Sequence, residues 1–168
     1  MTFWISGTQK MYEREAAPFH NLLAPTDGSA ASVDAGRLAI NIAATHDIPV
    51  TFLYVVNRST AEEIASASPR KDVALVCDEL RSKASHYLDY LSRLAKRAKV
   101  ECRQVIRVGD PQREIAELAR EETVDLIVIG QTSAPGITRP GRIGEVAGRV
   151  IEYASCPVLI VKHSEERY

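Results

Sequence analysis

A short, almost fully apolar run, Asp125-Leu-Ile-Val-Ile-Gly130, is the feature that most constrains the fold of this chain. It ends in glycine and leads into a loop rich in Gly, Pro, Ser and Thr, which opens an amphipathic segment near Gly144. The run is typical of a buried strand, and the loop is typical of one that ends at a helix N-terminus. In an open parallel sheet this place commonly holds the ligand, because helix N-termini favour anionic groups such as phosphates.

Further strands and helices alternate along the chain. Strands are predicted by apolar or alternating runs at residues 21–25, 50–56, 100–108 and 157–161. Helices are predicted by apolar residues at helical spacing, beginning after Ser29 or Ser32, near Asp72, after Asp110 and at Glu145. The polar stretch at residues 57–70, rich in Ala and Ser, is interpreted as a connection that includes a mobile part.

This alternation predicts the fold class. Buried strands joined by helices through right-handed crossovers make an α/β fold, a doubly wound parallel sheet with helices on both faces. We expect a single domain over residues 19–168, preceded by an N-terminal extension at residues 1–18. If the first and fourth strands are neighbours, the loops that follow them, at residues 26–29 and 130–142, face one crevice.

Composition excludes several classes of function. The 168 residues carry a formal net charge of −1, so the sequence lacks the excess of basic residues that is typical of proteins that bind nucleic acid. No apolar run approaches the roughly 18 residues that span a bilayer, and the start lacks the pattern of a signal peptide. The three cysteines are far apart and odd in number, which favours reduced thiols in the cytoplasm. We therefore expect a cytoplasmic protein without membrane or nucleic-acid partners.

The sequence contains no motif of a catalytic or metal site. The patterns GxSxG, HExxH and GxxxxGK[ST] are all absent. The histidines have no ligand spacing and no acidic or cysteine partner at motif distance, so no metal site is predicted. Because no general base or water-positioning residue can be named either, we expect no enzyme, with weak ATPase activity left open.

Four motifs, in order along the chain, resemble those of the universal stress protein family. They are Pro25-Thr-Asp-Gly-Ser29, Gly109-Asp-Pro111, Asp125-Leu-Ile-Val-Ile-Gly130 and Cys156-Pro-Val-Leu-Ile-Val161. Each motif is weak alone, but the series over residues 19–162 is specific. The resemblance implies a five-stranded sheet ordered 3-2-1-4-5, a homodimer joined through the last strands, and a role in stress response or signalling.

The resemblance also implies a site for ATP or another adenine nucleotide at the carboxyl ends of the first and fourth strands. The residues that match the family's site are Pro25, Thr26, Asp27, Val55, Ile129, Gly130, Gly144, Glu145 and Val146. Arg139 and Arg142 are candidate phosphate contacts, because guanidinium groups bind phosphate bidentately. A Mg²⁺ ion held with the help of Glu145 would offset the charge of the phosphates.

The loop departs from the family's glycine-rich pattern in three ways. Ser133 stands at the place of a glycine, one extra residue precedes Gly144, and Glu145 replaces a small hydroxyl residue. A carboxylate in the first turn of a helix is itself favoured by the helix dipole, and it repels phosphate oxygens in the same space. The alternative function is therefore the same fold with a degenerate pocket, acting through dimerisation and partner contacts.

A receiver-like domain that accepts a phosphoryl group is a remote third hypothesis. Residues at strand ends mimic the acidic, hydroxyl and lysine positions of a receiver, namely Asp27, Asp110, Thr132 and Lys162. We expect the stretch after Lys162 to be too short for the helix that follows the last strand of a receiver. Asp110, before Pro111, is better explained as a helix cap.

Overall fold

The sheet of this protein has the predicted order, and each neighbouring pair of its strands is parallel. The computed structural model describes residues 19–68, 72–131 and 143–163. In these ranges five strands lie in the order β3-β2-β1-β4-β5. Their bounds are β1 Leu22–Pro25, β2 Val50–Asn57, β3 Cys102–Gly109, β4 Leu126–Gly130 and β5 Val158–Val161. Receivers have the doubly wound order 2-1-3-4-5, so the receiver hypothesis is wrong.

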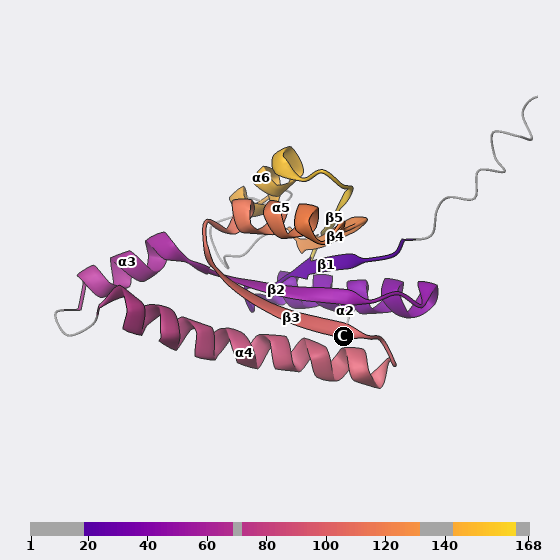
Figure 1. Cartoon of the computed structure of the whole chain (residues 1–168), viewed down its shortest axis with the longest axis horizontal. Coiled ribbons are helices and arrows are strands. Elements are labelled where there is room, and N and C mark those ends of the chain that lie inside the picture. Colours follow the sequence, from indigo (N-terminus) through magenta and orange to yellow (C-terminus); the bar gives the residue numbers. More distant parts are fainter. Residues whose placement is uncertain (1–18, 69–71, 132–142, 164–168) are drawn as a thin grey trace, which may run out of the picture.

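Helices cover both faces of the sheet, which confirms the doubly wound α/β fold (Figure 1). One face carries α2 (Ala30–His46) and α4 (Val73–Arg97), and the other carries α5 (Pro111–Glu121) and α6 (Glu145–Tyr153). A further helix, α3 (Arg58–Ser66), lies past the end of β2 beside the first turns of α4. Within the described ranges, no helix combines the length and the apolar character that crossing a membrane requires. The extension predicted at residues 1–18 lies outside the described residues.

Two apolar layers hold the sheet between its helices. Leu22, Phe52 and Leu91 are fully buried in the layer under α2 and α4. Leu23 and Ile127 are equally buried in the layer under α5 and α6. Neighbours such as Leu22 and Leu23 enter opposite layers because successive side chains of a strand point to opposite faces. This explains why the central strands are continuous apolar runs rather than alternating ones.

The interpretation of residues 57–70 as a connection is wrong for most of that stretch, which forms α3. The side chain of Asn57 caps this helix by accepting a hydrogen bond from the Thr60 N–H at 3.3 Å. Ala61 is the one residue of the helix that is buried. Its apolar residues at helical spacing, Ala61, Ile64 and Ala65, cover little more than one turn, which is too short a stripe to predict a helix by itself.

Two predicted helix starts differ in how they are capped. Ser29 caps α2 as predicted, because its side-chain oxygen accepts a hydrogen bond from the Ser32 N–H at 3.2 Å. Asp110 occupies the cap position of α5, before Pro111, but its side chain makes no capping hydrogen bond. Its carboxylate lies 3.8 Å from the guanidinium of Arg113 instead. The role of the Asp110 side chain as a cap is therefore wrong, and Pro111 begins the helix as predicted.

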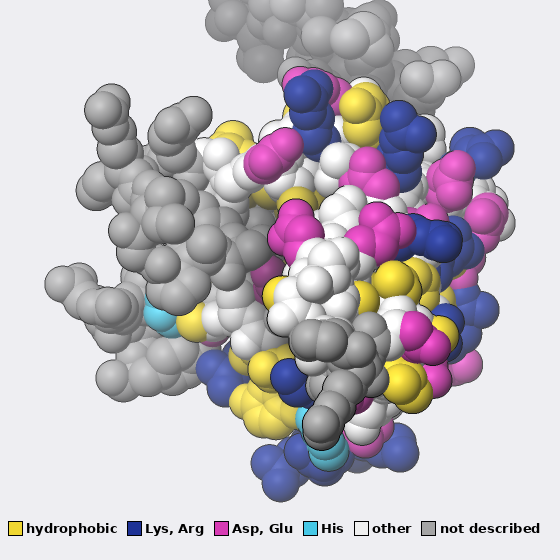
Figure 2. Space-filling model, turned by 90° about the vertical axis from the view of Figure 1, so that its left-hand side faces the viewer, with side chains coloured by type: hydrophobic (Ala, Val, Ile, Leu, Met, Phe, Trp, Pro, Cys, Tyr) yellow, Lys and Arg dark blue, Asp and Glu magenta, His cyan; other side chains and the backbone are white. Residues whose placement is uncertain are grey.

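Charged and hydrophobic side chains are mixed on the face seen in Figure 2, toward which the tip of α3 and α4 points. Acidic and basic side chains alternate over the upper half of this face. At the tip, Ile64 on α3 and Leu75 on α4 are 40% and 53% exposed. The mixture of signs agrees with the formal net charge of −1.

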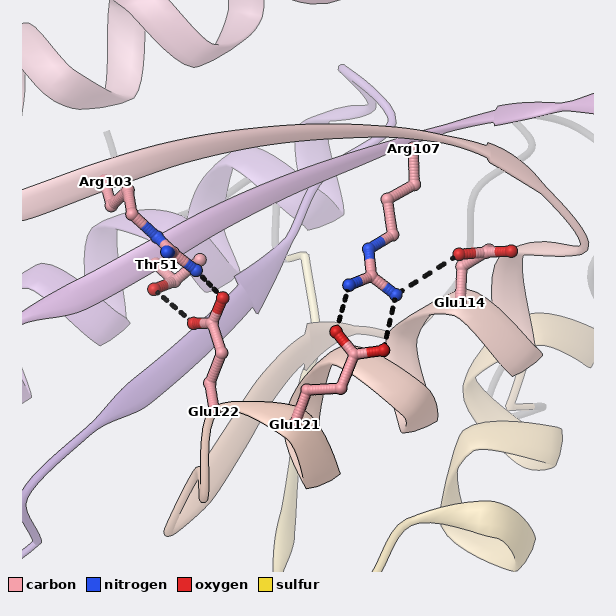
Figure 3. Close-up of polar contacts among 6 residues, drawn as sticks. All are labelled: Thr51, Arg103, Arg107, Glu114, Glu121 and Glu122. Carbon is pink, nitrogen blue, oxygen red and sulfur yellow. Dashed lines mark hydrogen bonds and ion pairs between the residues drawn. The ribbon is translucent and has the colours of Figure 1, made fainter.

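Ion pairs join the edge strand β3 to the first turn and to the end of α5 (Figure 3). Arg107 on β3 contacts the carboxylates of Glu121 and of Glu114, the latter at 3.4 Å. Arg103, four residues earlier and on the same face of the strand, pairs with Glu122 just after α5. Among the described strands, β3 pairs with β2 alone. The ion pairs therefore add a second attachment to a strand that is hydrogen-bonded to the sheet on one side.

The ion pair between Arg107 and Glu121 should make stability depend on pH. The hydrogen bond from Arg107 holds the pKa of Glu121 below its ordinary value of 4.5. A carboxylate with a lowered folded pKa adds stability above its unfolded pKa, and this is lost as the pH falls through the folded pKa. We therefore expect Glu121→Gln to lose less stability than the unchanged protein when the pH falls below 4.5, measured by urea unfolding. Glu117→Gln, an exposed position on the same helix, should behave like the unchanged protein; equal losses in all three would contradict the assignment.

Candidate functional site

β2 runs past the end of its neighbour β1, and this overhang creates a crevice in the sheet. β1 ends at Pro25, which lies opposite Leu53. β2 continues to Asn57 and stays paired with β3 over its whole length. On the other side of β1, β4 ends at Gly130. The β2 overhang, residues 54–57, therefore faces β4 across the end of β1, where doubly wound sheets bind their ligands.

Backbone groups of the β2 overhang face this crevice. The C=O of Leu53 accepts a hydrogen bond from the Thr26 N–H at 2.8 Å, so the polar groups of Leu53 point toward β1. Because these groups alternate in direction along a strand, the N–H and C=O of Val55 point the same way, beyond the end of β1. Val55 thus offers one donor and one acceptor to the crevice.

A cavity of about 320 Å³ lies at the crevice. Pockets for small molecules commonly have volumes of about 300–1,000 Å³, so this cavity is among the smaller ones. Eight of the nine nucleotide-site residues predicted from the sequence line it: Pro25, Thr26, Asp27, Val55, Ile129, Gly130, Gly144 and Val146. The ends of β1, β2 and β4 and the start of α6 bring them together. That they bind a nucleotide stays a prediction.

Glu145 is the exception among the predicted residues. It is the first residue of α6, between two lining residues, but its side chain is exposed and it does not belong to the described lining. The carboxylate that was expected to repel phosphates therefore lies outside the cavity wall. Ser133, Arg139 and Arg142, in the preceding loop, are outside the described residues.

Hydrogen bonds fix the turn after β1, which carries Asp27. The hydroxyls of Thr26 and Ser32, both buried residues, lie 3.0 Å apart. The carboxylate of Asp27 accepts a hydrogen bond from the Ser29 N–H at 2.9 Å. Gly28 has a φ of 83°, a conformation that glycine adopts without strain. Asp27 therefore acts as a turn residue, and it also lines the cavity.

Tyr54, on the β2 overhang, is a lining residue that the sequence did not reveal. Its ring is stacked on that of Tyr87 from α4, with ring centres 6.3 Å apart and planes 3° apart. Burial raises the pKa of Tyr54 above its ordinary value of 10.0, and the negative charge of Asp27 and the neighbouring Tyr87 raise it further. In the sequence Tyr54 belongs to an apolar run, which predicts a core position and no role in a site.

Other lining residues were not among those predicted from the sequence. They include Asn57 and Thr60 at the start of α3, Leu80 of α4, Pro111 and Ile115 of α5, and Gln131 after β4. Asn57 and Gln131 stand at strand ends, and this position is the signal that could have marked them. Thr60 and Leu80 carry no such signal, because the packing of α3 and α4 beside the overhang brings them to the cavity.

Gly130 ends β4 directly against the first turn of α2. A Cβ at this position would lie 2.7 Å from the carbonyl carbon of Ala31 and 2.8 Å from the backbone nitrogen of Ser32. A side chain cannot approach a backbone this closely, so glycine alone fits without a movement of α2. Packing of the helix on the sheet thus requires Gly130, in addition to its place at the cavity.

Comparisons with known proteins agree with this architecture. The family model described as the universal stress protein family matches residues 18–162. A universal stress protein of Methanocaldococcus jannaschii is 35% identical over 144 residues, which cover 86% of this chain and 82% of that protein. The solved structure of universal stress protein UspA from Lactobacillus plantarum has a TM-score of 0.69 at 26% identity, over 86% of this chain and 99% of that chain. A universal stress protein from Archaeoglobus fulgidus, solved in complex with dAMP, has a TM-score of 0.64 at 22% identity, over 86% of this chain and 99% of that chain.

Proposed function

We propose that this chain, which belongs to the universal stress protein family, binds an adenine nucleotide in the cavity at the ends of β1 and β4. The related protein from Archaeoglobus fulgidus, solved with dAMP, supports the choice of ligand class. The base would lie beside the β2 overhang and the phosphates toward the start of α6. The nucleotide-bound chain would act as a stress-response or signalling module.

The backbone of Val55 is the observation that carries this proposal. Its N–H and C=O present a donor beside an acceptor at the end of β1. The edge of adenine offers the complement, because N1 accepts a hydrogen bond and the 6-amino group donates. We infer that the Val55 N–H donates to N1 and that the Val55 C=O accepts one amino hydrogen. The carboxylate of Asp27 would accept the second amino hydrogen.

The other walls also fit a nucleotide. Val55, Ile115 and Ile129 supply apolar side chains on which a purine can pack. Gly144, the N-cap of α6, makes no side-chain cap, so the N–H groups of the first helical turn stay available to an anion. Arg139, Arg142 and a Mg²⁺ ion remain candidates for balancing the additional charge of ATP.

The proposal extends to assembly. We infer a homodimer joined through β5, an edge strand of the described sheet on which Leu159 is 37% exposed. An edge strand presents unpaired backbone groups along one side, to which a second copy can add. The dimer would work in the cytoplasm through contacts with partner proteins rather than by catalysis.

Nucleotide binding is tested by what the purified protein carries and by its thermal stability. Denaturing the purified chain should release an adenine nucleotide that chromatography identifies. A nucleotide at about 100 times its dissociation constant adds about 2.7 kcal/mol to the free energy of unfolding, so the Tm should rise with AMP, ADP or ATP in order of affinity. No released nucleotide, and no shift with any of the three at millimolar concentration, would contradict the proposal. The degenerate-pocket alternative would then stand.

A further inference from the structure

Tyr87 of α4 is outside the described lining of the cavity, yet it contacts two segments that form the lining. α4 packs along β2 and β3 (Figure 1). From there Tyr87 reaches Tyr54 on the β2 overhang and Gly28 in the turn after β1. These two segments carry Val55 and Asp27, the proposed contacts to the base.

The contact with Gly28 leaves no space between the ring and the backbone. A Cβ added to Gly28 would lie 2.5 Å from Cε2 and 2.6 Å from Cε1 of Tyr87, well inside the contact distance of two carbon atoms. The hydroxyl-bearing end of the ring therefore rests against this glycine. The φ of 83° at Gly28 independently disfavours other residues. Both the contact with the ring and the backbone conformation therefore favour glycine at this position.

The contact with Tyr54 attaches the same ring to the strand. The two rings are parallel to within 3°, and their centres are 6.3 Å apart, which is an offset stacked arrangement. The pKa of Tyr54 is raised first by burial and then by Asp27 and Tyr87, so the three groups share one environment.

We propose that Tyr87 is a positioning residue for the nucleotide site, an inference that rests on the proposed function. Its ring, held against Tyr54 and Gly28, adds to the hydrogen bonds that hold the turn, so that the carboxylate of Asp27 stays beside the edge of a base bound at Val55. The ring acts through Asp27 and does not touch the ligand. Without the ring the turn is held less firmly. The affinity for a 6-amino purine then falls more than the affinity for a 6-keto purine.

Calorimetric titration of the full chain with AMP and IMP tests this role. Tyr87→Leu removes the ring, Tyr87→Phe keeps it, and Tyr153→Leu makes the same change at a tyrosine of α6 that is 49% exposed. We expect Tyr87→Leu to weaken AMP binding about five- to tenfold and to change IMP binding about twofold or less. Tyr87→Phe and Tyr153→Leu should keep the AMP affinity and the AMP-to-IMP ratio of the unchanged protein. Circular dichroism verifies that each variant is folded.

A second measurement examines the contact without a ligand. Gly28→Ala should lower the Tm, because its methyl group meets the Tyr87 ring and because the φ is positive. The loss of Tm should be smaller in the Tyr87→Leu background, where the methyl group finds space. Additive losses would mean that ring and turn are uncoupled, and they would overturn the proposed role.

The two measurements separate this inference from the function on which it rests. If the unchanged protein binds AMP and Tyr87→Leu weakens AMP and IMP equally, or weakens neither, the positioning role is overturned and the proposed function stands. If the unchanged protein binds none of AMP, ADP and ATP, both are overturned.

Discussion

Replacing Gly130 by alanine should lower the free energy of unfolding by about 2–3 kcal/mol. The added methyl group would lie 2.7 Å from the carbonyl carbon of Ala31, 2.8 Å from the nitrogen of Ser32 and 2.9 Å from the oxygen of Ala31. These are backbone atoms in the first turn of α2, so no side chain can rotate away to make room. The helix has to move off β4 instead, where Val128 is buried in the layer under α2 and α4. Equilibrium unfolding in urea measures the change.

Gly148→Ala is the matched control, because it makes the same change within α6. A Cβ at Gly148 would meet no atom within 4 Å. Alanine there should raise the free energy of unfolding by about 0.5–1 kcal/mol, because glycine is a poor helix former. Equal effects at the two positions would contradict the packing constraint at Gly130.

Asp27→Asn should lower the affinity for AMP by about tenfold or more and reduce the preference for AMP over IMP, although the Val55 backbone still disfavours the N1–H and the 6-keto oxygen of IMP. The amide keeps the oxygen that accepts the hydrogen bond from the Ser29 N–H, so the turn should survive the change. The other carboxylate oxygen becomes an NH₂ group, which donates where the 6-amino group of adenine needs an acceptor. The same NH₂ group suits the 6-keto oxygen of IMP. Calorimetric titration with both nucleotides measures the ratio.

Asp72→Asn separates this effect from the general effect of removing an aspartate. Asp72 caps α4 by accepting a hydrogen bond from the Leu75 N–H at 2.8 Å, and it is not part of the described lining of the cavity. Its replacement should change both nucleotide affinities about twofold or less, because an asparagine caps a helix as well as an aspartate does. An affinity for AMP that is unchanged by Asp27→Asn would place the base away from Asp27.

Most of the fold could be predicted because its elements are marked by residues close together in the sequence. β4 is buried along its whole length and β2 over most of it, so their apolar runs identify them without knowledge of any partner. The order of the strands has no such local mark, and the resemblance of four motifs predicted it. α3 was missed because its apolar residues, Ala61, Ile64 and Ala65, cover little more than one turn, and of these only Ala61 is buried.

The residues of the site also differ in whether the sequence around them could predict their place. Asp27 and Gly130 stand at strand ends, which the sequence marks with turn residues, whereas Val55 was predicted by the family resemblance alone. Tyr54 and Tyr87 could not be predicted, since they are remote in the sequence and meet only when α4 packs on β2.

The direction of the Glu145 side chain was also beyond prediction. It depends on the residue at which α6 begins, and a shift of one residue turns a side chain by roughly 100° around the helix axis. α6 begins at Glu145 itself, and the side chain is exposed. The conflict between this carboxylate and a phosphate was inferred from proximity in the sequence, without the direction of the side chain, and it stays a prediction.

The overhang of β2 links the occupant of the cavity to the integrity of the sheet. Residues 54–57 are held extended by β3 alone, through pairs that run from Tyr54 and Ile106 to Asn57 and Gly109. Backbone groups that lose water without gaining a partner destabilise a protein. The side of this segment that faces away from β3 therefore needs either water or a ligand as its hydrogen-bond partner. A flat molecule with one acceptor and one donor on its edge would form there the hydrogen bonds that a longer β1 would form. In the proposed function, the bound nucleotide takes the hydrogen-bonding place beside residues 54–57 that β1 does not reach.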